Sequence, residues 1–227
     1  LHKAIRRQRQ MCIRDSYKKA YGEDEVTAFC ITLSAELSGS YNSAVLGQRL
    51  IEEEFPNKKV YVFNSRSACI GETLIALKIQ ECAEKGASFE EIVEQVEAYI
   101  SRRQTLFVLE NLDHLRKNGR LTGMKATLVS VLNIKPVMMG TPEGTIEQCS
   151  MGRGTKKALK KMIEEVGNRV SDFENRIFGI SHCNCPERAQ YVKEEIEKRY
   201  PFQKIIVADT AGVGTLYAND GGIVIAF

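Results

Sequence analysis

The sequence predicts an α/β protein with two domains, a parallel-sheet domain at residues 17–118 and a mixed-sheet domain at residues 119–227. Up to about residue 121, apolar runs of strand length alternate with amphipathic helical segments, which is the pattern of a parallel sheet. From residue 122 two strands flank a turn-rich connection, which indicates an antiparallel hairpin within a second sheet. The two patterns together favour a parallel sheet followed by a mixed one.

Composition places few limits on function. The chain has 227 residues, 43% hydrophobic and 27% charged, as in globular proteins with a substantial core. It contains no apolar run of the roughly 20 residues that a membrane-spanning helix needs, so we expect a cytoplasmic protein with at most transient membrane contact. Seven cysteines, without the spacing of a disulfide framework, indicate reduced thiols.

The basic N-terminus has the composition of an arm that binds nucleic acid, but we expect that it does not have this role. Residues 1–16 carry a net charge of +4, so the other residues carry −1 of the total +3. Residues 11–16 resemble a translated sequencing-adapter fragment. We therefore predict that residues 1–16 are a non-native segment and form no part of the fold. No nucleic-acid partner is expected.

The first domain is predicted as strands alternating with helices. Its strand at 26–33 is apolar and β-branched, as in strands buried on both faces, and the two strands around the first helix form a βαβ unit and hence a parallel pair. Ser88 and Glu91 have the spacing of a capping box at the start of a helix. The expected elements are strands at 26–33, 59–63 and 105–109 and helices at 41–54, 72–84, 89–100 and 112–117, the last stopped by Asn118 and Gly119.

The second domain is predicted from residue 119 onward. Strands at 134–139 and 145–149 form the hairpin, and Pro136 argues that its strand lies at a sheet edge or turns its backbone nitrogen outward. The other expected elements are helices at 125–132, 155–170 and 186–199 and strands at 176–181, 204–208 and 222–227.

The loop at residues 37–41, Leu-Ser-Gly-Ser-Tyr, joins the first strand to the first helix. Such a loop aims the unpaired N–H groups of the helix at a point beyond the strand end, where a carboxylate or phosphate is well received. Ser38 and Ser40 add hydroxyl donors, and Gly39 allows close approach of a ligand. An ordinary serine N-cap has the same pattern. Ser65 lies in a second polar loop, expected at the same sheet edge.

Other chemistry is sparse. The group His182-Cys183-Asn184-Cys185 offers metal ligands, but no second ligand pair completes a tetrahedral site, so we expect no metal and no cofactor. The chain has no GxSxG elbow, P-loop or GxGxxG motif. Ser38 and His182 both follow predicted strands and leave open a Ser38/His182-dependent hydrolase of lipids or esters.

Four segments together resemble the DegV family of fatty-acid-binding proteins over about residues 17–227: residues 31–44, 111–122, 134–136 and Arg153-Gly154. The resemblance implies two α/β domains with a long-chain fatty acid between them. It also implies a carrier, without catalytic residues of its own, that presents the fatty-acid carboxylate to a separate fatty acid kinase subunit. A helix at the Ser38 loop suits such a carboxylate.

The resemblance also implies site residues. Ser38 matches the family's carboxylate-binding serine, flanked by Gly39 and Ser40, and Arg120 and Arg153 match arginines that help neutralise the head group. Tyr217 stands where many members have a histidine, and a phenol can donate a hydrogen bond but not become a cation. The family's N-terminal strand and its threonine-bearing loop have no counterpart, so the resemblance implies an N-terminally truncated chain with an incomplete first domain.

Three interpretations follow. The first is the fatty-acid carrier that acts with a kinase. The second is the hydrolase, and the third is a scaffold without a ligand.

Overall fold

A computed structural model describes residues 15–17, 19, 27–121 and 133–227 of the chain. The predicted helix at 125–132 and most of the segment 1–16 lie outside these residues. The chain forms two compact units, one of residues 1–66 and 75–101 and one of residues 67–74 and 102–227. The second unit includes residues 67–74 and 102–118, which the predicted division assigned to the first domain.

The first unit is built on two parallel strands. β1 (Thr27–Thr32) and β2 (Lys59–Asn64) pair in register from Thr27 with Lys59 to Thr32 with Asn64, joined by the helix α2 (Ser40–Glu54). The predicted βαβ unit is confirmed.

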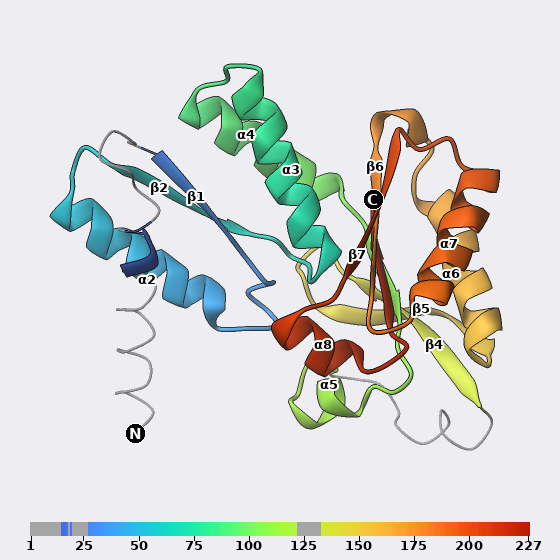
Figure 1. The fold of residues 1–227 in the computed structure, drawn as a ribbon. Coiled ribbons are helices and arrows are strands. Elements are labelled where there is room, and N and C mark those ends of the chain that lie inside the picture. Colours follow the sequence, from blue (N-terminus) through green and yellow to red (C-terminus); the bar gives the residue numbers. More distant parts are fainter. Residues whose placement is uncertain (1–14, 18, 20–26, 122–132) are drawn as a thin grey trace. The chain divides into compact units, whose positions relative to one another are not determined.

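Alternate residues of β2 face opposite sides of this strand pair, because successive side chains of a strand point in opposite directions. Val60 and Val62 pack with Ile51 of α2, whereas Phe63 packs with the helices α3 (Ile70–Glu84) and α4 (Phe89–Arg102). Figure 1 shows α2 on one face of the strands and α4 on the other. The predicted capping box opens α4: Ser88 N donates to Glu91 Oε2 at 2.8 Å, and Glu91 N donates to Ser88 Oγ at 3.3 Å.

The second unit contains a six-stranded mixed sheet with the order β5-β4-β3-β8-β6-β7. Only β6 and β7 pair in parallel, and the other neighbours are antiparallel. Its strands are β3 (Thr105–Val108), β4 (Ile134–Gly140), β5 (Ile146–Arg153), β6 (Ile177–His182), β7 (Lys204–Asp209) and β8 (Ile223–Ala226). The predicted hairpin is β4 and β5.

Helices cover both faces of this sheet. One face packs against α6 (Thr155–Arg169) and α7 (Pro186–Arg199), and a 3-10 turn, η1 (Phe173–Asn175), lies between α6 and β6. The other face packs against α5 (Asp113–Lys117) and α8 (Gly212–Ala218). In Figure 1 α6 and α7 lie together on one side of the sheet. No helix of the described residues is long and apolar enough to cross a membrane.

Three details differ from the sequence-based expectations. The strand β3 pairs with β4 and β8 rather than joining the parallel sheet of the first unit. The strand β4, which contains Pro136, is internal to the sheet and not at its edge. It pairs with β3 only at Met138 and Met139, so Pro136 lies outside that pairing. The helix α8 was not predicted, because its seven residues include Gly212 and Gly214 and are too few to show a clear period.

Candidate functional site

The Ser38 loop begins directly after β1 and is folded by its own backbone. The N–H groups of Leu37 and Ser38 both donate to the carbonyl of Ser34 at 3.0 Å. Gly39 then takes the N-cap position of α2, and no side chain caps the helix. The ordinary serine N-cap is therefore not formed. Ser38 Oγ instead accepts the N–H of Ser40 at 3.2 Å, which leaves the Ser38 hydroxyl proton able to donate to a ligand.

Asn64, the last residue of β2, ties this loop to the next one. Its Oδ1 accepts the N–H of Ala35 and the N–H of Arg66, each at 3.1 Å. Ser65 N donates to the carbonyl of Thr32 at 3.1 Å. The predicted neighbourhood of two polar loops at one sheet edge is confirmed.

Ser40, at the first turn of α2, carries a hydroxyl whose oxygen is buried and has no hydrogen-bond partner within the described residues. Buried polar atoms are rarely left unpaired, so this hydroxyl marks a position where a further acceptor fits. The first turn of α2 also has no acidic side chain, and a helix N-terminus favours an anion. Gly39 has open space around its α-carbon, with no atom within 4 Å of a Cβ added there. These features suit a carboxylate or a phosphate.

Arg120 and Tyr217 lie in the second unit, and Asn118 brings them together. Gly119 has a φ of +71° and closes α5, as predicted, and Arg120 N donates to the carbonyl of Leu115 at 2.8 Å. The Arg120 guanidinium donates to the carbonyl of Asn118. Asn118 Nδ2 donates to the Tyr217 hydroxyl oxygen at 3.2 Å. The Arg120 guanidinium and the Tyr217 phenol are thus both hydrogen-bonded to Asn118.

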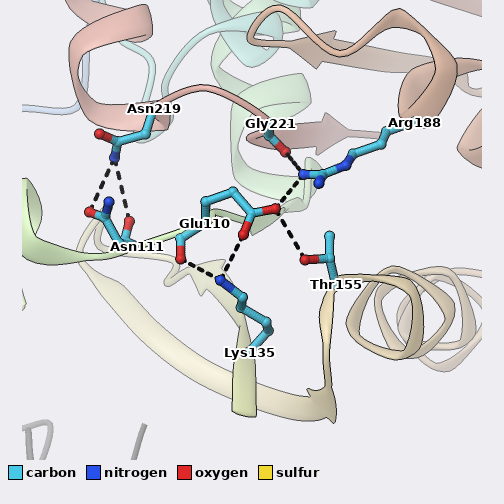
Figure 2. Close-up of polar contacts among 7 residues, drawn as sticks. All are labelled: Glu110, Asn111, Lys135, Thr155, Arg188, Asn219 and Gly221. Carbon is cyan, nitrogen blue, oxygen red and sulfur yellow. Dashed lines mark hydrogen bonds and ion pairs between the residues drawn. The ribbon is translucent and has the colours of Figure 1, made fainter. Parts of the chain in front are cut away.

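The C-terminal end of α8, just after Tyr217, is fastened to the segment after β3. Asn219 Nδ2 donates to the carbonyl of Tyr217 at 3.2 Å and faces the carbonyl and Oδ1 of Asn111 at 3.5 and 3.4 Å. Figure 2 shows the two contacts from Asn219 to Asn111. The end of the helix that carries Tyr217 is therefore held by side chains rather than by backbone bonds alone.

Glu110, next to Asn111, is the centre of a charged cluster that the sequence did not reveal (Figure 2). Lys135 Nζ donates to Glu110 Oε2 at 2.7 Å and to its carbonyl at 2.6 Å. Arg188 Nη1 donates to Glu110 Oε1 at 2.5 Å and to the carbonyl of Gly221 at 2.6 Å, and Thr155 Oγ1 donates to Oε1 at 3.1 Å.

These contacts also determine how Glu110 ionises. Partial burial raises the pKa of the Glu110 carboxyl, but the hydrogen bonds and charges of Lys135 and Arg188 outweigh burial and hold its pKa below the ordinary value. The cluster joins the segment after β3 to β4, α6, α7 and the turn before β8, and its one carboxylate is bonded by two cations. It therefore ties these segments together.

Arg153 ends β5 and is exposed, paired in register with Ile134. Its side chain makes no ion pair with any described residue. The structure therefore places Arg153 two positions before Thr155 of the Glu110 cluster, and it does not bring Arg153 into contact with Arg120 or Tyr217.

His182 is occupied within its own unit. Its Nδ1 accepts the N–H of Cys185 at 3.4 Å, and its Nε2 lies 3.4 Å from Oδ1 of Asp209. With both ring nitrogens engaged, neither is left to take a proton from a serine, so these contacts do not favour the hydrolase. Within the described residues no group of three or more His, Cys, Asp or Glu side chains could hold a metal ion, and the six described cysteines are free thiols.

Comparison of the sequence with known proteins shows which family the chain belongs to. A family model described as an uncharacterised protein of the DegV family matches residues 8–227. The chain belongs to the DegV family. The match begins inside residues 1–16, whose adapter origin stays a prediction. A DegV domain-containing protein of Streptococcus gordonii is 34% identical over 214 residues, which are 94% of this chain and 75% of the relative.

Solved structures of the DegV family show the same fold. A DegV family protein of Ruminococcus gnavus, with vaccenic acid, is 53% identical with a TM-score of 0.89, covering 94% of this chain and 76% of its own. A Eubacterium eligens member loaded with heptadecanoic acid is 30% identical with a TM-score of 0.85, covering 94% and 76%. The fatty acid kinase B3 protein of Streptococcus pneumoniae, loaded with linoleic acid, is 32% identical with a TM-score of 0.84, covering 94% and 75%.

Proposed function

We propose that this DegV-family protein binds a long-chain fatty acid, holds its carboxylate at the Ser38 loop and presents it to a fatty acid kinase subunit. The observation that carries the proposal is the pair of hydroxyls at the start of α2: Ser38 has a proton left to donate, and Ser40 has no hydrogen-bond partner among the described residues. Relatives of similar fold hold vaccenic, heptadecanoic and linoleic acid, and one is named for a fatty acid kinase.

The carboxylate needs several donors, because an ionised group that loses its hydration is costly unless hydrogen bonds or cations replace the water. Ser38 and Ser40 supply hydroxyl protons, and Gly39 leaves room for the head group beside the backbone. Arg120 and Tyr217, which Asn118 joins within the second unit, are a second set of donors of the kind that a fatty-acid carboxylate needs. Arg153, exposed and without an ion pair to any described residue, is assigned to the surroundings of the head group rather than to direct contact.

The acyl tail requires apolar surface, and exposed apolar side chains occur on both helices that carry the proposed head-group residues. Leu46 and Leu50 of α2 are 40% and 39% exposed, and Val213 and Leu216 of α8 are 61% and 54% exposed. Each methylene moved from water to an apolar environment contributes about 0.8 kcal/mol. A long chain bound on such surface gains far more than a short one.

The proposed role is that of a carrier and not of a catalyst. The reaction that we assign to the kinase subunit transfers a phosphoryl group to the fatty-acid carboxylate. The histidine of the hydrolase alternative, His182, is bonded to Cys185 and Asp209, and these contacts do not favour its pairing with a serine nucleophile. The donors of the Ser38 loop can orient the carboxylate and hold it ionised.

Binding is tested with delipidated protein titrated with a long-chain fatty acid. Ser38→Ala removes a donor to the carboxylate, so we expect about 10- to 150-fold weaker binding, the worth of one hydrogen bond to a charged group. Ser101→Ala is the matched control: among the described residues the Ser101 hydroxyl bonds to the carbonyl of Ala98 within α4, so this variant should bind the fatty acid as the unmodified protein does. Equal affinity of the Ser38→Ala and Ser101→Ala variants would contradict the assignment of the carboxylate to Ser38.

Presentation to a kinase is tested separately. The fatty-acid-loaded protein is mixed with the catalytic subunit of a bacterial fatty acid kinase and ATP, and acyl-phosphate is measured. We expect turnover that depends on this protein and is lost with the delipidated form. Binding of fatty acid without any acyl-phosphate would leave the carrier role intact and refute the kinase partnership.

A further inference from the structure

The hydroxyl of Tyr217 is used as an acceptor within the protein. Its oxygen takes the N–H of Asn118 Nδ2 at 3.2 Å, and this pair spans 99 positions of the sequence. A phenol has one proton to donate and an oxygen that can accept. Because Asn118 occupies the acceptor, the Tyr217 proton is left to point at another acceptor. An ionised carboxylate is such an acceptor, and it has no proton of its own to offer.

Asn118 also holds the Arg120 guanidinium, the cation that lies beside Tyr217 in the sequence of contacts. Its carbonyl accepts a hydrogen bond from the Arg120 guanidinium, and its own N–H donates to the carbonyl of His114 at 3.1 Å. The positive φ of Gly119 turns the chain between them. Asn118 is therefore held by the end of α5 while it contacts both proposed donors, one through its main chain and one through its side chain.

Asn219 holds the main chain of Tyr217 from the other side. Its backbone has φ 55° and ψ 166°, a combination that residues other than glycine rarely adopt. Its side-chain amide donates to the carbonyl of Tyr217 and faces the carbonyl and Oδ1 of Asn111 (Figure 2). A strained residue persists where its surroundings over-determine it, and these contacts supply that restraint.

The turn that follows is fastened as well. Arg188 donates to the carbonyl of Gly221 while it binds Glu110, and Gly222 N donates to the carbonyl of Asn219 at 3.1 Å. Gly221 has a φ of +86°, and a Cβ at this position would meet the Arg188 guanidinium. The carbonyl of Tyr217 and the turn that follows α8 are thus both held by side-chain contacts.

We propose that Asn118 and Asn219 are positioning residues that hold Tyr217 with its hydroxyl proton free to donate to a fatty-acid carboxylate. The inference rests on the proposed function and adds two residues to it. Asn118 sets the direction of the hydroxyl, and Asn219 sets the place of the residue that carries it. Neither side chain needs to touch the fatty acid.

The orientation by Asn118 is tested with a double-mutant cycle on the delipidated full chain, titrated with a long-chain fatty acid such as vaccenic acid. We expect Asn118→Ala and Tyr217→Phe each to weaken binding by about fivefold, and Asn118→Ala to change the affinity of the Tyr217→Phe protein less than about twofold. Lys117→Ala, a change of an exposed neighbour on α5, is the control and should bind as the unmodified protein does.

The role of Asn219 is tested with Asn219→Gly, which relieves the strained backbone and removes the side chain. We expect a thermal midpoint equal to or above that of the unmodified protein, together with fatty-acid binding weakened by about threefold or more. A purely structural role would move stability and affinity in the same direction.

The outcomes separate the two proposals. If Asn118→Ala weakens the Tyr217→Phe protein as much as it weakens the unmodified one, or if Asn219→Gly binds normally, the positioning role is refuted while fatty-acid binding stands. If the unmodified delipidated protein takes up no fatty acid, both the proposed function and this inference fail.

Discussion

Replacement of Glu110 by alanine should destabilise the second unit strongly, because it leaves two cations facing each other. The carboxylate accepts hydrogen bonds from Lys135, Arg188 and Thr155 at 2.5–3.1 Å, and its side chain is 29% exposed. A hydrogen bond to a charged group is worth about 1.5–3 kcal/mol. Lys135 is 19% exposed and Arg188 is 36% exposed, so the arginine contribution is reduced by solvent screening. We expect Glu110→Ala to cost about 2–4 kcal/mol and Glu110→Gln about half as much.

The assay is urea unfolding followed by circular dichroism, with amide hydrogen exchange to assign the loss to one unit. Peptides of β6 and β8 should lose protection, whereas peptides of β1 and β2 should keep it, since the two units have separate cores. The matched control is Glu164→Gln, which removes an exposed ion pair to Lys161 on α6 and should leave the unfolding midpoint nearly unchanged.

The pH dependence gives this prediction a second readout. The pKa of Glu110 in the folded protein is below its ordinary value of 4.5, so its contribution is fully present above that value and is lost as the pH falls through the folded pKa. The stability gap between the unmodified protein and Glu110→Gln should therefore shrink as the solution is acidified from neutral to below about pH 4. A gap that is independent of pH, or a Glu110→Ala variant as stable as Glu164→Gln, would refute the reasoning.

Two further predictions concern single elements. Ser88→Ala removes half of the capping box of α4 and should cost about 1 kcal/mol, measured by urea unfolding, and a loss below about 0.3 kcal/mol would mean that the box contributes little. Phe178→Ala empties a fully buried position whose ring stacks on Phe227 at 5.6 Å between centroids and should cost about 3–5 kcal/mol in the same experiment. A loss under about 1 kcal/mol would show that this core collapses around the gap.

Elements with a strong local signal are predictable from the sequence. The two-residue period of Val60 to Phe63 places alternate side chains on opposite faces of β2, and the capping box marks the start of α4. The Ser38 loop was predicted because strand, short loop and helix follow one another within a few residues. What the sequence could not show is that Gly39, and not a serine, takes the N-cap position.

Features that depend on distant partners could not be predicted. The strand β3 is buried at every position and three of its four residues are apolar, which fits a buried strand in either sheet, and its pairing with β8 joins segments over a hundred residues apart. Glu110 meets Lys135 and Arg188 at separations of 25 and 78 residues, and Asn118 meets Tyr217 at 99. Charged and amide side chains carry no periodic signal of their tertiary partner, so such contacts appear only once the fold is known.

The central claim, that this DegV-family protein is a fatty-acid carrier, is tested most directly by native mass spectrometry of the freshly purified full chain, followed by extraction and identification of the released lipid. We predict a mass above that of the polypeptide by one long-chain fatty acid, and a smaller bound fraction for Ser38→Ala than for Ser101→Ala. A mass equal to that of the polypeptide alone, with no fatty acid in the extract and none taken up on addition, would contradict the claim.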